Sequence, residues 1–76
     1  MGDRVKVIDA RGEVAPLPLL ELRRALDKAA PGQGVELVSD DPAMSADVEM
    51  FIKASGHELV YTQEEDASVR FTVRKV

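Results

Sequence analysis

The chain has 76 residues, a formal net charge of −4 and no cysteine. This length predicts one small domain over residues 1–76, and the hydrophobic fraction of 45% with only 4% aromatics predicts an aliphatic core. The lack of cysteine excludes disulfides, thiolate metal ligands and a thiol nucleophile. The acidic balance argues against a general nucleic-acid or anionic-membrane binder, because such proteins need clustered Lys and Arg.

The first residues predict a strand followed by a tight connection. Val5–Ile8 is a β-branched run typical of a strand, and Asp9–Val14 is a connection that can turn sharply at Gly12. Met1–Arg4 leads directly into the strand, so we expect no signal peptide. No apolar run approaches the roughly 18 residues of a membrane span. These features predict a cytoplasmic protein.

A helical period of apolar residues begins at Pro16. Pro18 fits the first turn of a helix, where a missing N–H is tolerated, and Pro31 with Gly32 predicts its end. Charged residues fill the opposite face, so we expect an amphipathic helix. Its apolar stripe consists of Leu19, Leu22, Leu26 and Ala29.

The second half of the chain predicts a strand, a helix and a hairpin. The strand is Val35–Val38, and the segment 40–42 (Asp-Asp-Pro) predicts a helix start with an Asp cap and Pro at the first helical position. Gly56 predicts a left-handed residue at the end of that helix. Strands over 58–62 and 69–74 flank an acidic turn at 63–67. The predicted stripe of the second helix is Met44, Val48, Phe51, Ile52 and Ser55.

The resulting order is βαβαββ. It predicts an α/β fold of the α+β two-layer sandwich type, with a four-stranded mixed sheet and two helices on one face. The first and second strands are expected to be parallel, and the crossover between them is expected to be right-handed.

Position 15 lies just before the first predicted helix. Backbone N–H groups there lack intrahelical partners, and the helix dipole adds partial positive charge. A cysteine at this place would have a lowered pKa, whereas the methyl group of Ala15 can do no such chemistry. Pro16 and Pro18 restrict the backbone and are expected to hold the side chain outward, while Gly12 lets the loop turn.

The segment Asp9–Pro18, with the sequence DARGEVAPLP, resembles the D-x-x-G-x-x-C-P-x-P signature of the TusA/SirA-type sulfur carriers. It matches at every fixed position except the cysteine, where Ala15 stands. The resemblance continues in order to Lys75 and covers nearly the whole chain. The further matching positions are 22–26, 31–32, 40–43, 47, 51, 56–59 and 71–75.

This resemblance implies a βαβαββ sandwich similar to the C-terminal domain of translation initiation factor three. It also implies a sulfur relay between proteins, in which a persulfide on the signature cysteine is received from a cysteine desulfurase or rhodanese-type donor. The sulfur then passes to an acceptor protein, toward tRNA 2-thiouridine, molybdenum cofactor or sulfur oxidation. By the same resemblance Ala15 occupies the catalytic position and Gly12, Pro16 and Pro18 shape it. No cofactor and no metal are implied.

Ala15 leaves two explanations open. The chain is either a laboratory Cys-to-Ala variant of a sulfur carrier, or a natural cysteine-less member that acts as a non-catalytic protein-binding or regulatory module. A nucleic-acid-binding role rests only on analogy with the initiation-factor domain, and the acidic charge argues against it. We therefore expect protein partners, no direct nucleic acid and no membrane.

Several charged residues have both a functional and a structural interpretation. Arg11, Arg23 and Arg24 could contact a partner or an anion, or belong to a solvated surface. Asp40 and Asp41 fit a helix cap with a solvated neighbour better than a metal site.

Two further features are assigned mainly structural roles. His57 follows a predicted helix end, where a cation is favoured, and we expect it to be structural. Four basic residues are expected on the open sheet face, within a surface of mixed charge: Lys6, Arg70, Arg74 and Lys75.

Overall fold

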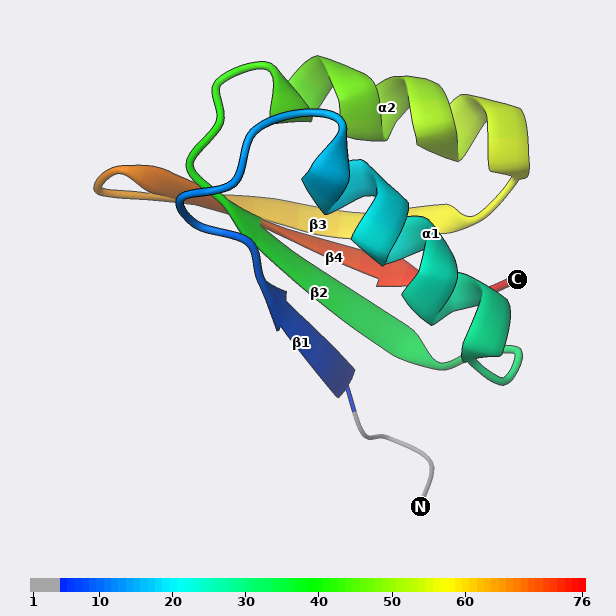
Figure 1. Cartoon of the computed structure of the whole chain (residues 1–76). Helices are drawn as coiled ribbons and strands as arrows, with labels where there is room; N and C mark the ends of the chain where they lie inside the picture. The colour runs from blue at the N-terminus through cyan, green and yellow to red at the C-terminus, as the bar shows by residue number, and fades with distance from the viewer. Residues whose placement is uncertain (1–4) are drawn as a thin grey trace.

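A computed structural model of the chain describes residues 5–76, so the interpretation of Met1–Arg4 lies outside the described residues. The elements follow the predicted βαβαββ order (Figure 1). Both helices pack on the same face of a four-stranded mixed sheet, as predicted. The bounds are β1 Val5–Asp9, α1 Leu17–Lys28, β2 Gly34–Ser39, α2 Met44–Ser55, β3 Glu58–Glu65 and β4 Ser68–Arg74.

The sheet has the strand order β1-β2-β4-β3. β1 runs parallel to β2, and β4 is antiparallel to both β2 and β3. Because β1 and β2 are parallel neighbours, their carboxyl ends lie at the same end of the sheet. The loops that follow these two strands therefore meet, and one of them carries position 15 (Figure 1).

The core lies between the sheet and the two helices. Leu22 and Leu26 of α1 and Val48 of α2 are fully buried against the strands. Alternation along β2 and β4 turns every second residue toward these helices. The strand residues that fill this layer are Val35, Leu37, Phe71 and Val73.

Both helices begin later than the sequence predicts. α1 begins at Leu17, with Pro18 buried in its first turn, and ends at Lys28, ahead of Pro31 and Gly32. α2 begins at Met44, so Pro42 is not its first residue. A turn over residues 41–44 precedes α2, in which the Met44 N–H donates to the Asp41 carbonyl at 3.0 Å. Gly56 ends α2 with a φ of 81°, as predicted.

The predicted stripe of α2 is correct in part, since Met44 and Val48 are buried, Phe51 and Ile52 are half-buried, and Ser55 is exposed.

The hairpin departs further from the sequence prediction than the helices do. β3 continues to Glu65, and only residues 66 and 67 form the turn. The residues assigned to an acidic turn from 63 onward instead pair with β4 up to the contact between Glu65 and Ser68. Within residues 5–76, no helix is long and apolar enough to cross a membrane.

Candidate functional site

The loop between β1 and α1 is anchored to the core at its first residue. Ala10 is fully buried, and its N–H donates to the Val38 carbonyl at 2.8 Å, which extends the pairing of β1 with β2. The loop then turns at Gly12, whose φ is 88°. An L-residue rarely adopts this conformation, so the expected role of Gly12 in the turn agrees with the backbone.

Two adjacent carboxylates from the β2–α2 loop hold this turn in place. Asp40 accepts the Gly12 N–H with both carboxylate oxygens, at 3.0 and 3.1 Å. Asp41 accepts the Ala15 N–H with Oδ2 at 2.7 Å, and its Oδ1 accepts the Ala43 N–H at 3.0 Å. These two N–H groups, that of Ala43 first, lower the pKa of Asp41 below its ordinary value. Asp41 therefore joins the start of α2 to the backbone of position 15.

These contacts correct the predicted roles of the aspartates. Asp40 is not simply a solvated neighbour, because its carboxylate holds Gly12 across 28 residues of sequence. Asp41 caps the turn ahead of α2 and not the helix itself, whose N-cap position is Ala43 with no side-chain cap. Among residues 5–76 no group of three or more potential metal ligands gathers.

The backbone around position 15 offers an anion fewer donors than the sequence predicts. Pro16 and Pro18 have no N–H, the Leu17 N–H donates to Val14, and the Ala15 N–H is used by Asp41. Fewer free N–H groups are therefore available to lower the pKa of a thiol at position 15 than the sequence predicts. The charge of Asp41 also opposes the formation of a thiolate beside it.

Ala15 is half-buried and packs against the hydrophobic core. Its methyl group is therefore only partly exposed, and the outward direction expected for a cysteine at this position stays a prediction. Pro16 is exposed at the position before α1, whereas Pro18 is buried within the first turn. The two prolines thus fix the entry to α1 from opposite sides, one facing solvent and one facing the core.

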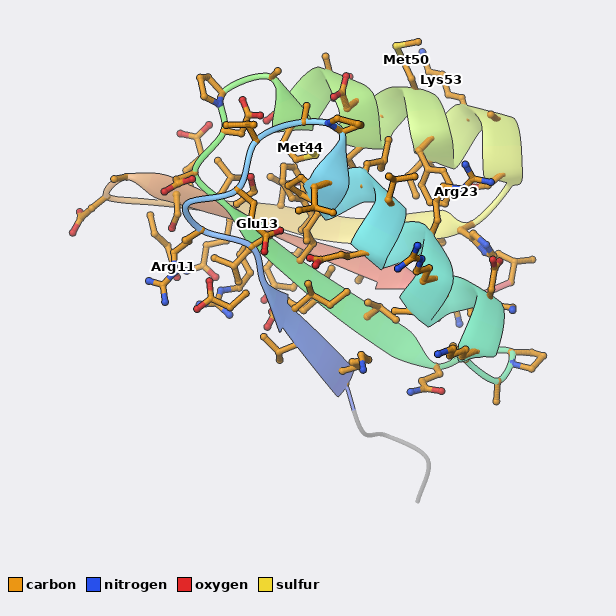
Figure 2. All side chains as sticks on the ribbon, in the orientation of Figure 1. Arg11, Glu13, Arg23, Met44, Met50 and Lys53 are labelled. Carbon is orange, nitrogen blue, oxygen red and sulfur yellow. The ribbon has the colours of Figure 1, made fainter. Side chains whose placement is uncertain are left out.

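The three arginines singled out in the sequence do not converge on position 15. Arg11 forms a bidentate pair with Asp9, at 2.9 and 2.7 Å, and this pair lowers the pKa of Asp9 to about 2. Arg23 lies further along α1, whereas Arg11 sits at the outer bend of the loop (Figure 2). Arg24 lines a cleft between α1 and β1. A partner or anion contact by these residues stays a prediction.

The other basic residues do not form one patch on the open sheet face. Arg70 pairs with Glu36 at 2.9 Å and Glu65 at 3.5 Å, and Arg74 pairs with Glu58. Lys75 Nζ instead donates to the Leu26 carbonyl at 2.7 Å, near the end of α1. The expectation of mixed charge on this face is confirmed for the two arginines.

Lys6 lines the cleft between β1 and α1. His57 Nδ1 accepts the Val76 N–H at 3.2 Å, and its ring centroid lies 6.1 Å from that of Phe51. These contacts agree with a structural role for His57.

Sequence reasoning missed the contacts of Asp40 and Asp41 with the loop, and it did not single out Glu13. The signal for the aspartates was present in the topology. Both directly follow β2, and the loop after a parallel neighbouring strand must lie beside them. Glu13 carried no such signal, because its setting depends on how α1 packs over β1.

The family model described as sulfurtransferase TusA matches residues 6–75 of this chain. The chain belongs to the TusA family. The sulfur carrier protein TusA of Allochromatium vinosum is 32% identical over 75 residues, which cover 99% of each chain. A protein of Archaeoglobus fulgidus, whose name calls it a candidate sulfur carrier protein, is 37% identical over 92% of this chain and 96% of its own length.

The fold of this TusA-family chain also matches a solved structure. The crystal structure of the SirA-like protein from Desulfitobacterium hafniense superposes with a TM-score of 0.79, covering 93% of this chain and 96% of that one. The identity is 21%, so this likeness concerns the fold. It agrees with the two helices and four-stranded mixed sheet described above.

Proposed function

We propose that this chain has the form of a protein-to-protein sulfur carrier whose sulfur-bearing position is residue 15. The observation that carries the proposal is the hydrogen bond from the Ala15 N–H to Asp41 at 2.7 Å. A side-chain anchor from another loop fixes the backbone of this residue while its side chain reaches the surface only in part. Membership of the TusA family supports the assignment.

The chemistry belongs to a cysteine at this position, because Ala15 cannot carry sulfur. The cysteine thiolate attacks the terminal sulfur of a donor persulfide, and a new S–S bond forms at position 15. The donor's own S–S bond breaks, and the donor leaves as a thiolate. The persulfide at position 15 then gives its terminal sulfur to an acceptor thiolate by the same exchange.

The partners in this proposal are proteins. The donor is a cysteine desulfurase or a rhodanese-type protein, and the acceptor is a sulfur-accepting protein. By family resemblance, the acceptor serves tRNA thiolation, molybdenum-cofactor assembly or sulfur oxidation. Arg11, Arg23 and Arg24 remain proposed partner or anion contacts, and the cytoplasmic location expected from the sequence remains a prediction.

A direct test restores the thiol with Ala15→Cys. The variant is incubated with a cysteine desulfurase and L-cysteine, and intact-mass spectrometry follows the gain of one sulfur atom. We expect the gain, and its loss when an acceptor thiol protein is added. Ala54→Cys, which places a thiol at an exposed position of α2, is the matched control. Failure of Ala15→Cys to gain sulfur, or equal gain by Ala54→Cys, would overturn the carrier assignment.

A second candidate function is a non-catalytic binding module. This candidate is favoured because Asp40 and Asp41 hold the backbone of Gly12 and Ala15 in place although Ala15 cannot carry sulfur. The codon for residue 15 in the source gene separates the two. An alanine codon supports the binding module for the natural protein, and a cysteine codon supports the carrier.

A further inference from the structure

The loop between β1 and α1 also borders a cleft that the proposed sulfur relay does not use. This cleft lies between β1 and α1 and has a volume of about 400 Å³. Glu13 lines this cleft, whereas Arg11 lies apart from it at the outer bend of the loop (Figure 2). The charged residues that line the cleft are Lys6 and Asp9 of β1, Glu13 of the loop, and Glu21, Arg24 and Lys28 of α1.

Glu13 has an unusual setting for a carboxylate. Its Oε1 is shielded from solvent and has no hydrogen-bond partner among residues 5–76. None of the cations that line the cleft forms an ion pair with Glu13 in this part of the chain. A charged oxygen without water or a donor is unfavourable, because its lost hydration is not replaced.

Protonation would remove this difficulty, since a carboxylic acid can donate a hydrogen bond. The neighbouring acceptor is the Glu21 carboxylate in the second turn of α1. Burial raises the pKa of Glu13 above its ordinary value, and the negative charge of Glu21 raises it further. The ability of Glu21 to accept a hydrogen bond from protonated Glu13 and the charge of Asp9 act in the same direction. Two adjacent carboxylates commonly share one proton for these reasons.

We propose that the Glu13 carboxyl, when it is protonated, donates a hydrogen bond to the Glu21 carboxylate across the cleft that both line, which ties the loop over residues 10–16 to α1. The loop is then held by two sets of contacts. Asp40 and Asp41 hold the backbone N–H groups of Gly12 and Ala15, and Glu21 holds the side chain between them. Glu13 is thus a positioning residue for position 15, and its contact depends on one proton.

The direction of the pH effect follows from the raised pKa. The folded chain binds this proton more tightly than the unfolded chain does. The stabilisation is therefore complete below the unfolded pKa of Glu13 and is lost as the pH rises through the folded pKa. Above that point two carboxylates face each other, and their repulsion loosens the loop on this side.

The first test measures the proton itself. Side-chain carboxyl carbons are followed by NMR as a function of pH in the chain as it stands. We expect Glu13 to titrate above the ordinary range of glutamate side chains. Glu21→Gln should lower the Glu13 midpoint, because it removes the neighbouring charge and offers an amide donor. Glu49→Gln should leave that midpoint unchanged. A Glu13 midpoint within or below the ordinary glutamate range would overturn the proposal.

The second test separates the proton from the mere presence of a side chain. Glu13→Gln keeps a donor for Glu21 at every pH, whereas Glu13→Ala removes it at every pH. We expect the intrinsic-rate-corrected amide exchange of Gly12 to rise with pH in the original chain and to stay low in Glu13→Gln. An equal pH dependence of Gly12 amide exchange in the original chain and in Glu13→Gln would contradict the proposed hydrogen bond between Glu13 and Glu21. Neither test requires a thiol, so their outcome is independent of the proposed sulfur relay.

Discussion

The backbone of residue 15 is held in place by a side chain that is distant from it in sequence. The contact of Asp41 with the Ala15 N–H fixes the backbone but also places a carboxylate beside the proposed site of sulfur chemistry. Since both prolines and Leu17 offer no free N–H, the helix N-terminus gives little compensation at this point. The geometry therefore favours a carrier that holds its sulfur in a defined place over one that strongly stabilises a thiolate.

Asp41→Asn tests this anchoring role at the level of one atom. Asp41 uses Oδ2 for Ala15 and Oδ1 for Ala43, so an amide, which has one acceptor oxygen, must lose one of the two bonds. We expect a lower urea midpoint at neutral pH. Asp40→Asn is the matched control, because its two oxygens share a single N–H and one acceptor oxygen can replace them. Equal losses in the two variants would contradict the assignment.

The pH dependence of the Asp41 contact has the opposite sign to that of Glu13. The pKa of Asp41 is lowered by the N–H groups of Ala43 and Ala15, so the unfolded chain binds this proton more tightly. Its stabilisation is present above the unfolded pKa and is lost as the pH falls through the folded pKa. We expect the urea midpoint of Asp41→Asn to change less than that of the original chain on acidification. An identical acid profile for both chains would show that Asp41 contributes nothing to it.

Among the elements, the loop over residues 10–16 depends on the backbone freedom of Gly12. A methyl group added there meets no atom within 4 Å, so the cost of Gly12→Ala comes from its φ of 88° alone. That cost is about 1–2 kcal/mol for an L-residue in the left-handed region. Gly56 has a φ of 81° and equally open surroundings at the end of α2, which makes Gly56→Ala a matched control.

The two glycine variants separate stability from site geometry. We expect similar losses of stability in thermal or urea unfolding for Gly12→Ala and Gly56→Ala. In the Ala15→Cys background, only Gly12→Ala should also slow sulfur uptake from a cysteine desulfurase, because only that turn presents position 15. Equal uptake rates in the two variants would show that the turn at Gly12 does not position residue 15.

The elements themselves follow from local patterns, whereas the site depends on how they meet. The leucines of α1 and the alternation in β4 predict a helix and a strand because each pattern repeats within its own segment. The start of α2 is misplaced because Asp41 and Pro42 favour a helix N-terminus and a tight turn alike. The contacts of Asp40 with Gly12 and of Asp41 with Ala15 span 28 and 26 residues, so no local pattern contains them.

At the scale of the whole molecule, only one face of the sheet is covered by helices (Figure 1). The opposite face keeps its charges in cross-strand pairs, such as Arg70 with Glu36 and Arg74 with Glu58. The exposed pair of Arg74 with Glu58 contributes little to stability, and the pair of Arg70 with Glu36 is half-buried at the sheet surface, so the helix-covered layer must supply most of the stability. In a chain of 76 residues this leaves a modest margin.

Leu22→Ala tests how far the molecule depends on that layer. Leu22 is fully buried in α1, and its truncation should cost about 2–5 kcal/mol, a large part of the roughly 5 kcal/mol expected for a small domain. Leu20 lies two residues away in the same helix with 42% exposure, so Leu20→Ala should change stability by no more than about 0.5 kcal/mol. Urea unfolding followed by circular dichroism measures both. If α1, the sheet and the loop at position 15 share one core, Leu22→Ala should also increase amide exchange at Gly12 and Val38 together. An increase confined to α1 would show that the helix opens on its own and that the site does not depend on the common core.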